Sequence, residues 1–385
     1  MPVRPGDARA LLETLVRVDS RNPDLVPGAP GEANCAHVLA EVLGGWGFRL
    51  QWQDAAPGRP NLVARIGAAR PGAPTLLFNG HLDVVGTDGM THAPFAPHVA
   101  DGRLYARGAC DMKAGIAAMC VAAHRAAGDG LPGEVIVAAV CDEEYASIGT
   151  RALLAAGVRA DAAVVTEPTR LAICPAHKGF AWLEFTVHGV AAHGSRHDIG
   201  VDAIAHAAQL AVAWTTHGRD VLRSVTHPLL GHASVHASTI TGGSGWSTYP
   251  DRCVLRVERR TVPGEDAQTV HDEATRIVAA LQAALPALRV EWTVPLVQAP
   301  SDVATDAPIV RALQRATAAH AGEAAPIEGL GCWTDAALLN AAGIPAVCYG
   351  PGDIALAHAA TEWVPLAEVE AAAAVLEGLA RAWCA

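Results

Sequence analysis

The sequence lacks the patterns that mark membrane and exported proteins. It contains no stretch of about 18 uninterrupted apolar residues, although 51% of its 385 residues are hydrophobic, so we expect no membrane-spanning helix. Its first residues carry no cluster of positive charge followed by an apolar segment, so we expect no export signal. We therefore predict a cytoplasmic protein whose chain starts with an amphipathic helix over about residues 7–18.

Cysteine pairs and an excess of basic residues are also missing. The nine cysteines include no C-x-x-C pair, which excludes a zinc ribbon or a dithiol redox motif, and their scattered positions suit buried thiols in a reducing compartment. Lysine and arginine number 28 against 39 acidic residues, for a formal net charge of −11. Because nucleic acid requires a basic surface, we expect no nucleic-acid partner, and basic partners or cations are the better match.

The first part of the chain has the pattern of an α/β domain. Helical and strand-like segments alternate from about residue 34 to residue 178, which is typical of a mostly parallel sheet with helices on its faces. Three of the strand-like segments are nearly continuous apolar runs, as expected for strands covered on both sides. These runs are residues 75–78, 135–140 and 162–165.

The pattern changes after Gly179 and changes back near residue 300. In between, apolar and polar residues alternate in four segments, and two helical segments separate them in a βαββαβ order, which predicts an antiparallel sheet covered by helices on one face. A chain of this length is too long for a single core of about 250–300 residues. We predict a catalytic domain formed by residues 1–178 and 295–385, with an inserted α+β domain at residues 179–294.

The first candidate site residues follow the strand at 75–78. His81 and Asp83 lie just past its end, and ligands of open α/β sheets gather at the carboxyl ends of strands. Asp83 is able to accept a hydrogen bond from His81 and so fix the tautomer of a metal-bound imidazole. An H-x-D triplet is also common by chance and does not by itself indicate a site.

Acidic residues form the second set of candidates, and each has a plainer explanation. Asp111 precedes an alanine-rich helical segment, where aspartate commonly caps a helix. Asp142, Glu143 and Glu144 follow a buried strand, and three carboxylates buried there would repel one another unless cations neutralised them. The same three residues on a solvated loop would need no cation.

Two further candidates come later in the chain. Glu167 ends the strand at 162–165, and His358 lies in a glycine-rich turn, where a lone histidine is often a surface or packing residue. The common position is more informative than any single residue, because four candidates lie at strand ends of one predicted sheet and the other two lie in adjoining loops. The four are His81, Glu143, Glu144 and Glu167, and the two are Asp111 and His358. Two histidines and several carboxylates are ligands that catalytic zinc accepts while it keeps one position open for water.

The motifs around these residues resemble a known family. The sequence is similar to the family of dizinc hydrolases that contains acetylornithine deacetylase, succinyl-diaminopimelate desuccinylase and aminoacylase. The resemblance spans almost the whole chain and follows the family's order of motifs. The matching segments are GHLDVV, GACDMKAG, CDEE, TEPT, AAHGS, ERRTVPGE and GPGDIALAH.

The resemblance implies a zinc-peptidase-like catalytic domain with two zinc ions that share Asp111. Such a pair lowers the pKa of a shared water and polarises an amide carbonyl, and cobalt or manganese can substitute for zinc. It also implies that Glu143 is the general base, that Asp83 orients His81, and that the Asp111–Met112 peptide is cis. The implied ligands are His81, Asp111 and Glu167 for one ion, and Asp111, Glu144 and His358 for the other.

The same resemblance implies that the inserted domain is a lid and the surface of a homodimer. His193 matches a histidine that stabilises the tetrahedral oxyanion, often from the partner subunit, and Arg260 matches an arginine that binds the substrate carboxylate. The plainer alternatives are a histidine that caps the following helix and an arginine in a strand-end salt bridge. Ser247 stands where many members have asparagine. Trp333 stands where several have glycine, so it either lines the substrate pocket or packs in the core.

The predicted activity is removal of the acyl group from a small N-acyl amino acid, as in acetylornithine deacetylase. A dipeptidase or carboxypeptidase of the same family, acting on a dipeptide, is the nearest alternative. A catalytically silent metal-binding dimer is the second. A membrane partner is not expected.

Overall fold

The computed structural model describes residues 3–128 and 130–385, which pack as two compact units. The first unit comprises the chain up to Pro175 together with Val303–Glu328 and Thr334–Ala385. The second comprises Ala176–Asp302 and Gly329–Trp333. No helix in the described part of the chain is long and apolar enough to cross a bilayer.

The first unit contains most of a mixed sheet whose central strands are parallel. Strand β15 and the last two residues of β8 and of β16 fall within the residues of the second unit. The strand order is β1-β2-β6-β3-β7-β17-β8-β15. The four central strands, β6, β3, β7 and β17, run parallel to one another, and the strands on either side of them pair antiparallel. The apolar runs predicted as buried strands form β3, β6 and β7, so the predicted α/β class with a mostly parallel sheet is confirmed. The strands are β1 (Arg49–Ala56), β2 (Arg59–Gly67), β3 (Thr75–His81), β6 (Glu134–Val140), β7 (Ala162–Val165), β8 (Ile173–His177), β15 (Ser301–Asp302), β16 (Ile327–Leu330), which pairs with β8, and β17 (Ala346–Cys348).

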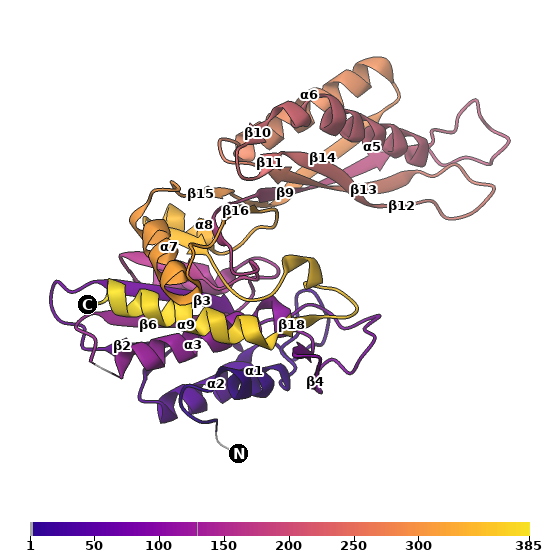
Figure 1. The fold of residues 1–385 in the computed structure, drawn as a ribbon. Coiled ribbons are helices and arrows are strands. Elements are labelled where there is room, and N and C mark those ends of the chain that lie inside the picture. The colour runs from indigo at the N-terminus through magenta and orange to yellow at the C-terminus, as the bar shows by residue number, and fades with distance from the viewer. Residues whose placement is uncertain (1–2, 129) are drawn as a thin grey trace. The chain divides into compact units, whose positions relative to one another are not determined.

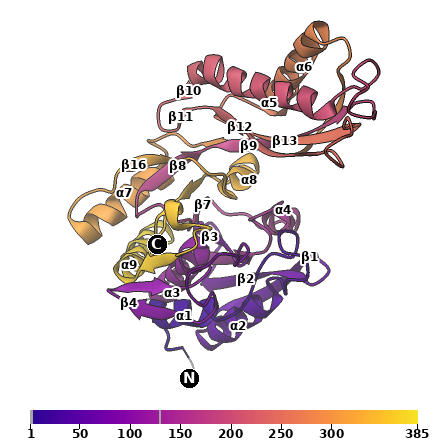
Figure 2. The same cartoon turned by 90° about the vertical axis from the view of Figure 1, so that its right-hand side faces the viewer.

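Helices cover both faces of this sheet. One layer contains α1 (Ala8–Val16), α2 (Ala33–Gly45), α3 (Ala114–Ala127), α7 (Pro308–Ala321) and α9 (Leu366–Trp383), and α9 packs along α3 (Figures 1 and 2). The other contains α4 (Ile148–Ala155) and α8 (Ala336–Ala341). A small sheet of β4 (His98–Ala100), β5 (Arg103–Tyr105) and β18 (Trp363–Pro365) lies beside them.

The first helix shows how local sequence sets an element's bounds. The Asp7 side chain accepts a hydrogen bond of 2.9 Å from the N–H of Ala10 and caps the helix. Leu11, Leu12 and Leu15 recur at helical spacing and are fully buried in the core of the first unit. The helix predicted over about residues 7–18 is therefore present.

The second unit is an antiparallel sheet with two helices, in the predicted βαββαβ order. The strand order is β12-β13-β9-β14, and inward-facing residues such as Leu183, Phe185 and Leu255 pack against Trp214 of the first helix. A short pair, β10 (Thr226–His227) and β11 (Gly231–His232), lies in one connection. The elements are β9 (Gly179–His188), α5 (Ala203–Asp220), β12 (Ser234–Gly242), β13 (Arg252–Thr261), α6 (Ala267–Ala284) and β14 (Arg289–Gln298).

Candidate metal centre

Three neighbouring parallel strands of the first unit end at the same edge and carry most of the candidate residues. His81 is the last residue of β3, Glu143 and Glu144 follow β6, and Glu167 follows β7. Because β3 lies between β6 and β7 and all three run parallel, their carboxyl ends meet. The structure thus brings together side chains that are far apart in the sequence.

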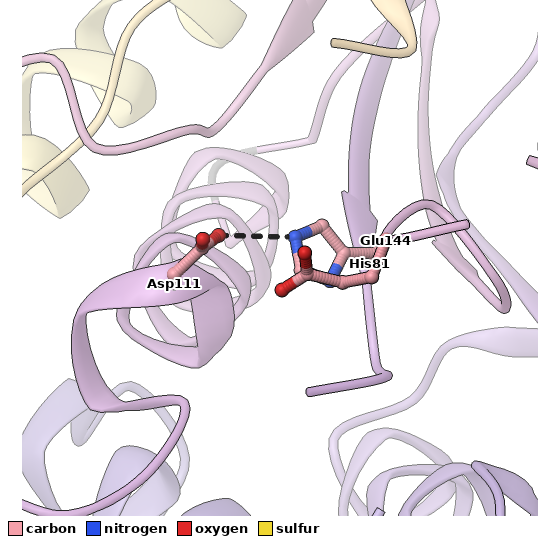
Figure 3. A group of neighbouring side chains, drawn as sticks. All are labelled: His81, Asp111 and Glu144. Carbon is pink, nitrogen blue, oxygen red and sulfur yellow. Dashed lines mark hydrogen bonds and ion pairs between the residues drawn. The ribbon is translucent and has the colours of Figure 1, made fainter. Parts of the chain in front are cut away.

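His81, Asp111 and Glu144 form the first cluster of possible ligands. Their ligand atoms all lie within 4.8 Å of one another, and His81 Nε2 lies 3.1 Å from Asp111 Oδ1 (Figure 3). His358 reaches the same place from the loop after β17, with its Nε2 3.0 Å from Glu144 Oε2 and 3.4 Å from Asp111 Oδ2. Asp111 lies between the two imidazoles, as a carboxylate shared by two ions would.

His81, Glu143 and Glu167 form a second cluster within the same 4.8 Å limit. His81 Nε2 is 3.9 Å from Glu143 Oε2 and also 3.9 Å from Glu167 Oε1, so neither pair is hydrogen-bonded. Glu167 Oε1 is buried and has no hydrogen-bond partner among the residues that the structure describes. An unpartnered buried carboxylate oxygen is costly unless a cation contacts it.

The structure decides between the alternatives that the sequence left open for the acidic residues. Asp111 does not cap α3, whose N-cap is Lys113, and its carboxylate contacts the two histidines instead. The side chains of Glu143 and Glu144 are 10% and 7% exposed, so they do not lie on a solvated loop. The peptide between Asp111 and Met112 is cis, as predicted.

The buried cluster carries more negative than positive charge, and this excess shifts the pKa values of its side chains. Burial, and then the neighbouring carboxylates, raise the pKa values of Glu143 and Glu167 well above their usual range. Hydrogen bonds to Asp111 and Glu144 raise the pKa of His358 to about 10. The pKa of His81 is also raised, since its bond to Asp111 and the surrounding carboxylates outweigh burial. Divalent cations would supply the missing positive charge and displace these protons.

Asp83 has a different partner from the one expected. His81 Nδ1 lies 3.0 Å from the backbone carbonyl oxygen of Asp83 and 3.6 Å from its carboxylate, so the carbonyl is the hydrogen-bond acceptor. The carboxylate instead accepts the N–H groups of Glu143 and Glu144, each at 3.2 Å. Asp83 therefore supports the centre from two sides, with its backbone on His81 and its side chain on the loop after β6.

A buried network beneath that loop was not anticipated from the sequence. Asn22 Nδ2 donates to Asp83 at 2.8 Å and to Asp142 at 3.0 Å. Arg59 Nη2 donates to Asp142 at 3.1 Å, and the Arg59 guanidinium forms a two-point bond with Glu32, with both distances 2.6 Å. Asp142 thus turns away from the candidate ligands and anchors the loop, whereas the next two residues face the cluster.

Two predicted site residues, His193 and Ser247, lie in exposed segments of the second unit. His193 Nδ1 is 2.8 Å from Ser195 Oγ, and the backbone oxygen of Ser247 accepts the N–H of Gly194 at 2.8 Å. The following helix α5 is capped by Asp202, so the capping alternative for His193 is wrong. The oxyanion role of His193 remains a prediction.

Arg260 and Trp333 also belong to the second unit. Arg260 Nε donates to Glu258 at 2.7 Å, and its guanidinium lies 5.3 Å from the centre of the Phe180 ring. The adjacent Arg259 is completely buried and forms ion pairs with acidic side chains, so it is not available to a ligand. Trp333 is 8% exposed and packs edge-on against Phe180, contacts that support the core-packing alternative.

Comparison with known proteins agrees with this geometry. A model of the Peptidase family M20/M25/M40 matches residues 77–382, which is most of the chain. The chain belongs to this family. It is 32% identical to acetylornithine deacetylase from Myxococcus xanthus, covering 98% of this chain and 97% of that protein. It is also 32% identical to N-acetyl-L-citrulline deacetylase from Xanthomonas campestris, covering 93% of each chain.

A solved structure of the same family has the same fold. A dinuclear metal-binding M20 peptidase from Bacillus subtilis superimposes with a TM-score of 0.71 at 18% identity, covering 98% of this chain and 97% of that one. This chain, as a member of the M20 family, is therefore a metal-dependent hydrolase that acts on amide bonds, of the deacylase or peptidase type. A dinuclear metal site is typical of its family.

The residues of this M20 chain fit a pair of divalent cations. The cluster supplies histidine nitrogens and carboxylate oxygens, which suit zinc, cobalt and manganese. A cation in the cluster would contact the unpartnered oxygen of Glu167 and would offset the burial and the negative charge that raise the pKa of Glu143. Neither feature has an evident purpose in a centre without a cation.

Proposed function

We propose that this protein removes the acyl group from a small N-acyl amino acid, as acetylornithine deacetylase does. The observation that carries the proposal is a buried cluster of candidate metal ligands in a chain that is 32% identical to an acetylornithine deacetylase over nearly its full length. Within the centre, His81, Asp111 and Glu167 would hold one zinc ion, and Asp111, Glu144 and His358 would hold the other.

The zinc pair, when bound, supplies the positive charge that polarises the amide carbonyl and makes water acidic. Glu143 acts as the proton acceptor, since it is buried beside the ligands and the proposed ligand set does not require it. After it accepts the proton of the attacking water, Glu143 delivers it to the nitrogen of the leaving amine. Asp83 holds the segment that carries Glu143 and the ring of His81.

The inserted domain, residues 179–294, is proposed as a lid and as the surface of a homodimer, with the catalytic domain formed by residues 1–178 and 295–385. His193 donates a hydrogen bond to the oxyanion that forms during attack, and it does so from the partner subunit. Arg260 binds the carboxylate of the substrate, because a guanidinium fork matches a carboxylate. Its ion pair with Glu258 and its contact with Phe180 hold the guanidinium ready for that role.

A substrate panel tests the proposal against its nearest alternative. The family's name includes peptidases, so a dipeptidase or carboxypeptidase activity is the rival. With zinc-loaded protein, we expect kcat/KM for N-acetyl amino acids to exceed that for dipeptides of the same residue by at least about tenfold, a difference of about 1.4 kcal/mol in transition-state binding. A higher value for dipeptides would overturn the assignment. Binding of two zinc ions without hydrolysis of any amide would indicate a silent metal-binding protein.

Replacement of Arg260 tests the carboxylate contact. We expect Arg260→Ala to lower kcat/KM for N-acetyl amino acids by about 10- to 100-fold, because a hydrogen bond to a charged group contributes about 1.5–3 kcal/mol. The same variant should lower kcat/KM much less for substrates in which a carboxamide replaces the carboxylate. Arg256 lies on the same face of β13, is 62% exposed and pairs with Glu184, so Arg256→Ala is the control. An equal loss for both kinds of substrate would rule out the contact.

A further inference from the structure

Glu362 is a buried carboxylate to which no role has been assigned so far, and it accepts hydrogen bonds from the loop that carries Asp111. It is 1% exposed. Its Oε1 accepts the N–H groups of Cys110 at 2.8 Å and Asp111 at 3.1 Å. Its Oε2 accepts the N–H of Gly108 at 3.0 Å and the guanidinium of Arg107 at 2.7 Å. One carboxylate thus holds the backbone of the Asp111 loop at three N–H groups and also binds the side chain of Arg107.

These bonds hold the backbone of the Asp111 loop. The N–H groups at the start of a helical segment have no carbonyl partner within the segment, and a charged acceptor makes stronger bonds to them than a neutral one. Arg107 adds a second attachment, since its Nε donates to the carbonyl of Gly86 at 3.0 Å. Gly108 has φ +77°, and a Cβ there would lie 2.5 Å from Val84, so the backbone is closely confined.

The same carboxylate belongs to the loop that carries His358. Glu362 follows His358 by four positions and immediately precedes β18, whose Trp363 pairs with Tyr105 of β5. His358 has a φ of +59°, a left-handed conformation that non-glycine residues rarely adopt, so its backbone depends on its surroundings. Its side chain is 53% exposed and receives little support from packing. Glu362 therefore ties the His358 loop directly to the Asp111 loop, whereas the other bonds of this segment, from Ala360 and Thr361, go to Thr91.

We propose that Glu362 is a positioning residue that fixes Asp111 and His358 relative to each other, and thereby sets the affinity for the divalent cation that they share. This inference rests on the proposed function, in which these two residues and Glu144 hold one of the two ions. Glu362 does not contact the cation or the substrate. It acts through the backbone of one ligand and the loop of the other.

Zinc affinity of a Glu362→Gln variant tests the inference. The amide keeps the shape of the side chain, but its NH2 group opposes backbone N–H donors and its lost charge leaves Arg107 without an ion-pair partner. Competition with a chelating indicator should show that one of the two zinc equivalents binds about 10- to 100-fold more weakly, as is typical when a residue supporting a ligand is replaced. The other equivalent should weaken by a smaller factor, because it shares Asp111 but keeps His81 and Glu167 as ligands. At limiting zinc kcat should fall, and excess zinc should restore most of it with little change in KM.

Glu134→Gln is the matched control, since Glu134 is an ion-paired carboxylate at the first residue of β6, at the opposite end of the strand from Glu143. It should leave both zinc affinities unchanged. Glu362→Asp keeps the charge but shortens the side chain, so it should weaken the same equivalent by a smaller factor. It also provides the decisive measurement if circular dichroism shows that Glu362→Gln does not fold.

The outcomes separate this inference from the proposed function. If the wild-type chain fails to bind two zinc ions or to hydrolyse any amide, the proposed function itself is wrong. If the wild-type chain does both, and the folded Glu362 variants bind both ions as tightly as it does, only the role of Glu362 is overturned. Equal weakening of both ions would also overturn it, because it would indicate a general loss of structure.

Discussion

Replacing Glu143 with glutamine should lower kcat by about 10²- to 10⁴-fold, the usual contribution of a general acid–base residue. The variant should still bind two zinc ions, and KM should change much less than kcat. The reason is that the amide fills the same space beside His81 but cannot accept the proton of the attacking water. Steady-state kinetics together with metal analysis of the same preparation measure both quantities.

Comparison of Glu167→Gln with Glu143→Gln shows which of these two neighbouring carboxylates is the base and which is a metal ligand. Both carboxylates lie 3.9 Å from His81 and share one cluster, so geometry alone gives them similar positions. The Glu167 variant should lose metal as well as kcat, whereas the Glu143 variant should lose only kcat. If Glu143→Gln lost a zinc ion, Glu143 would be a ligand and the proton acceptor would have to be sought elsewhere. Glu134→Gln should change neither quantity.

Removal of the metal should abolish hydrolysis, by a factor of more than about 10³, since metal ions contribute several kcal/mol of transition-state stabilisation. Prolonged treatment with a chelator followed by desalting should give inactive protein, and added zinc should restore activity. Zinc binding should release protons from these side chains, because in the metal-free protein His358 has a pKa of about 10 and Glu167 has a raised pKa. Zinc affinity should therefore fall as the pH is lowered.

Calorimetry in buffers with different ionisation enthalpies measures the number of protons released. His358→Ala is an informative companion, because it removes one proposed ligand and one of the displaced protons together. Full amidase activity after exhaustive metal removal would show that the mechanism is wrong. So would zinc binding that is independent of pH below about pH 10, where His358 of the metal-free protein is protonated and must lose its proton to bind zinc.

The parts of the fold that sequence predicted correctly are those with a strong local pattern. The apolar runs of β3, β6 and β7 indicated buried parallel strands, and the helix capped by Asp7 had regular apolar spacing. Since strand ends of a parallel sheet meet, the same patterns brought His81, Glu144 and Glu167 to one place. Asp111 and His358 were candidates in adjoining loops, and the family resemblance supplied their roles as ligands, because no local rule places a loop residue in a site.

The residues that sequence analysis missed act through contacts between distant segments. Glu362 binds the backbone near Asp111 from 251 positions away, and Asn22 reaches Asp142 across 120 positions. A buried glutamate or asparagine has no spacing rule, so nothing local marks these as supporting residues. Asp83 was singled out, but its carboxylate bonds to backbone N–H groups that no side-chain motif records. Cysteine, by contrast, behaved as composition indicated, with eight of the nine free thiols buried.

The most direct test of the central claim is X-ray diffraction from crystals of the zinc-loaded protein, measured on both sides of the zinc absorption edge. We expect two anomalous peaks at the ends of β3, β6 and β7, with Asp111 touching both ions, His81 and Glu167 on one, and Glu144 and His358 on the other. A single peak, or peaks away from these side chains, would contradict the proposed dizinc centre.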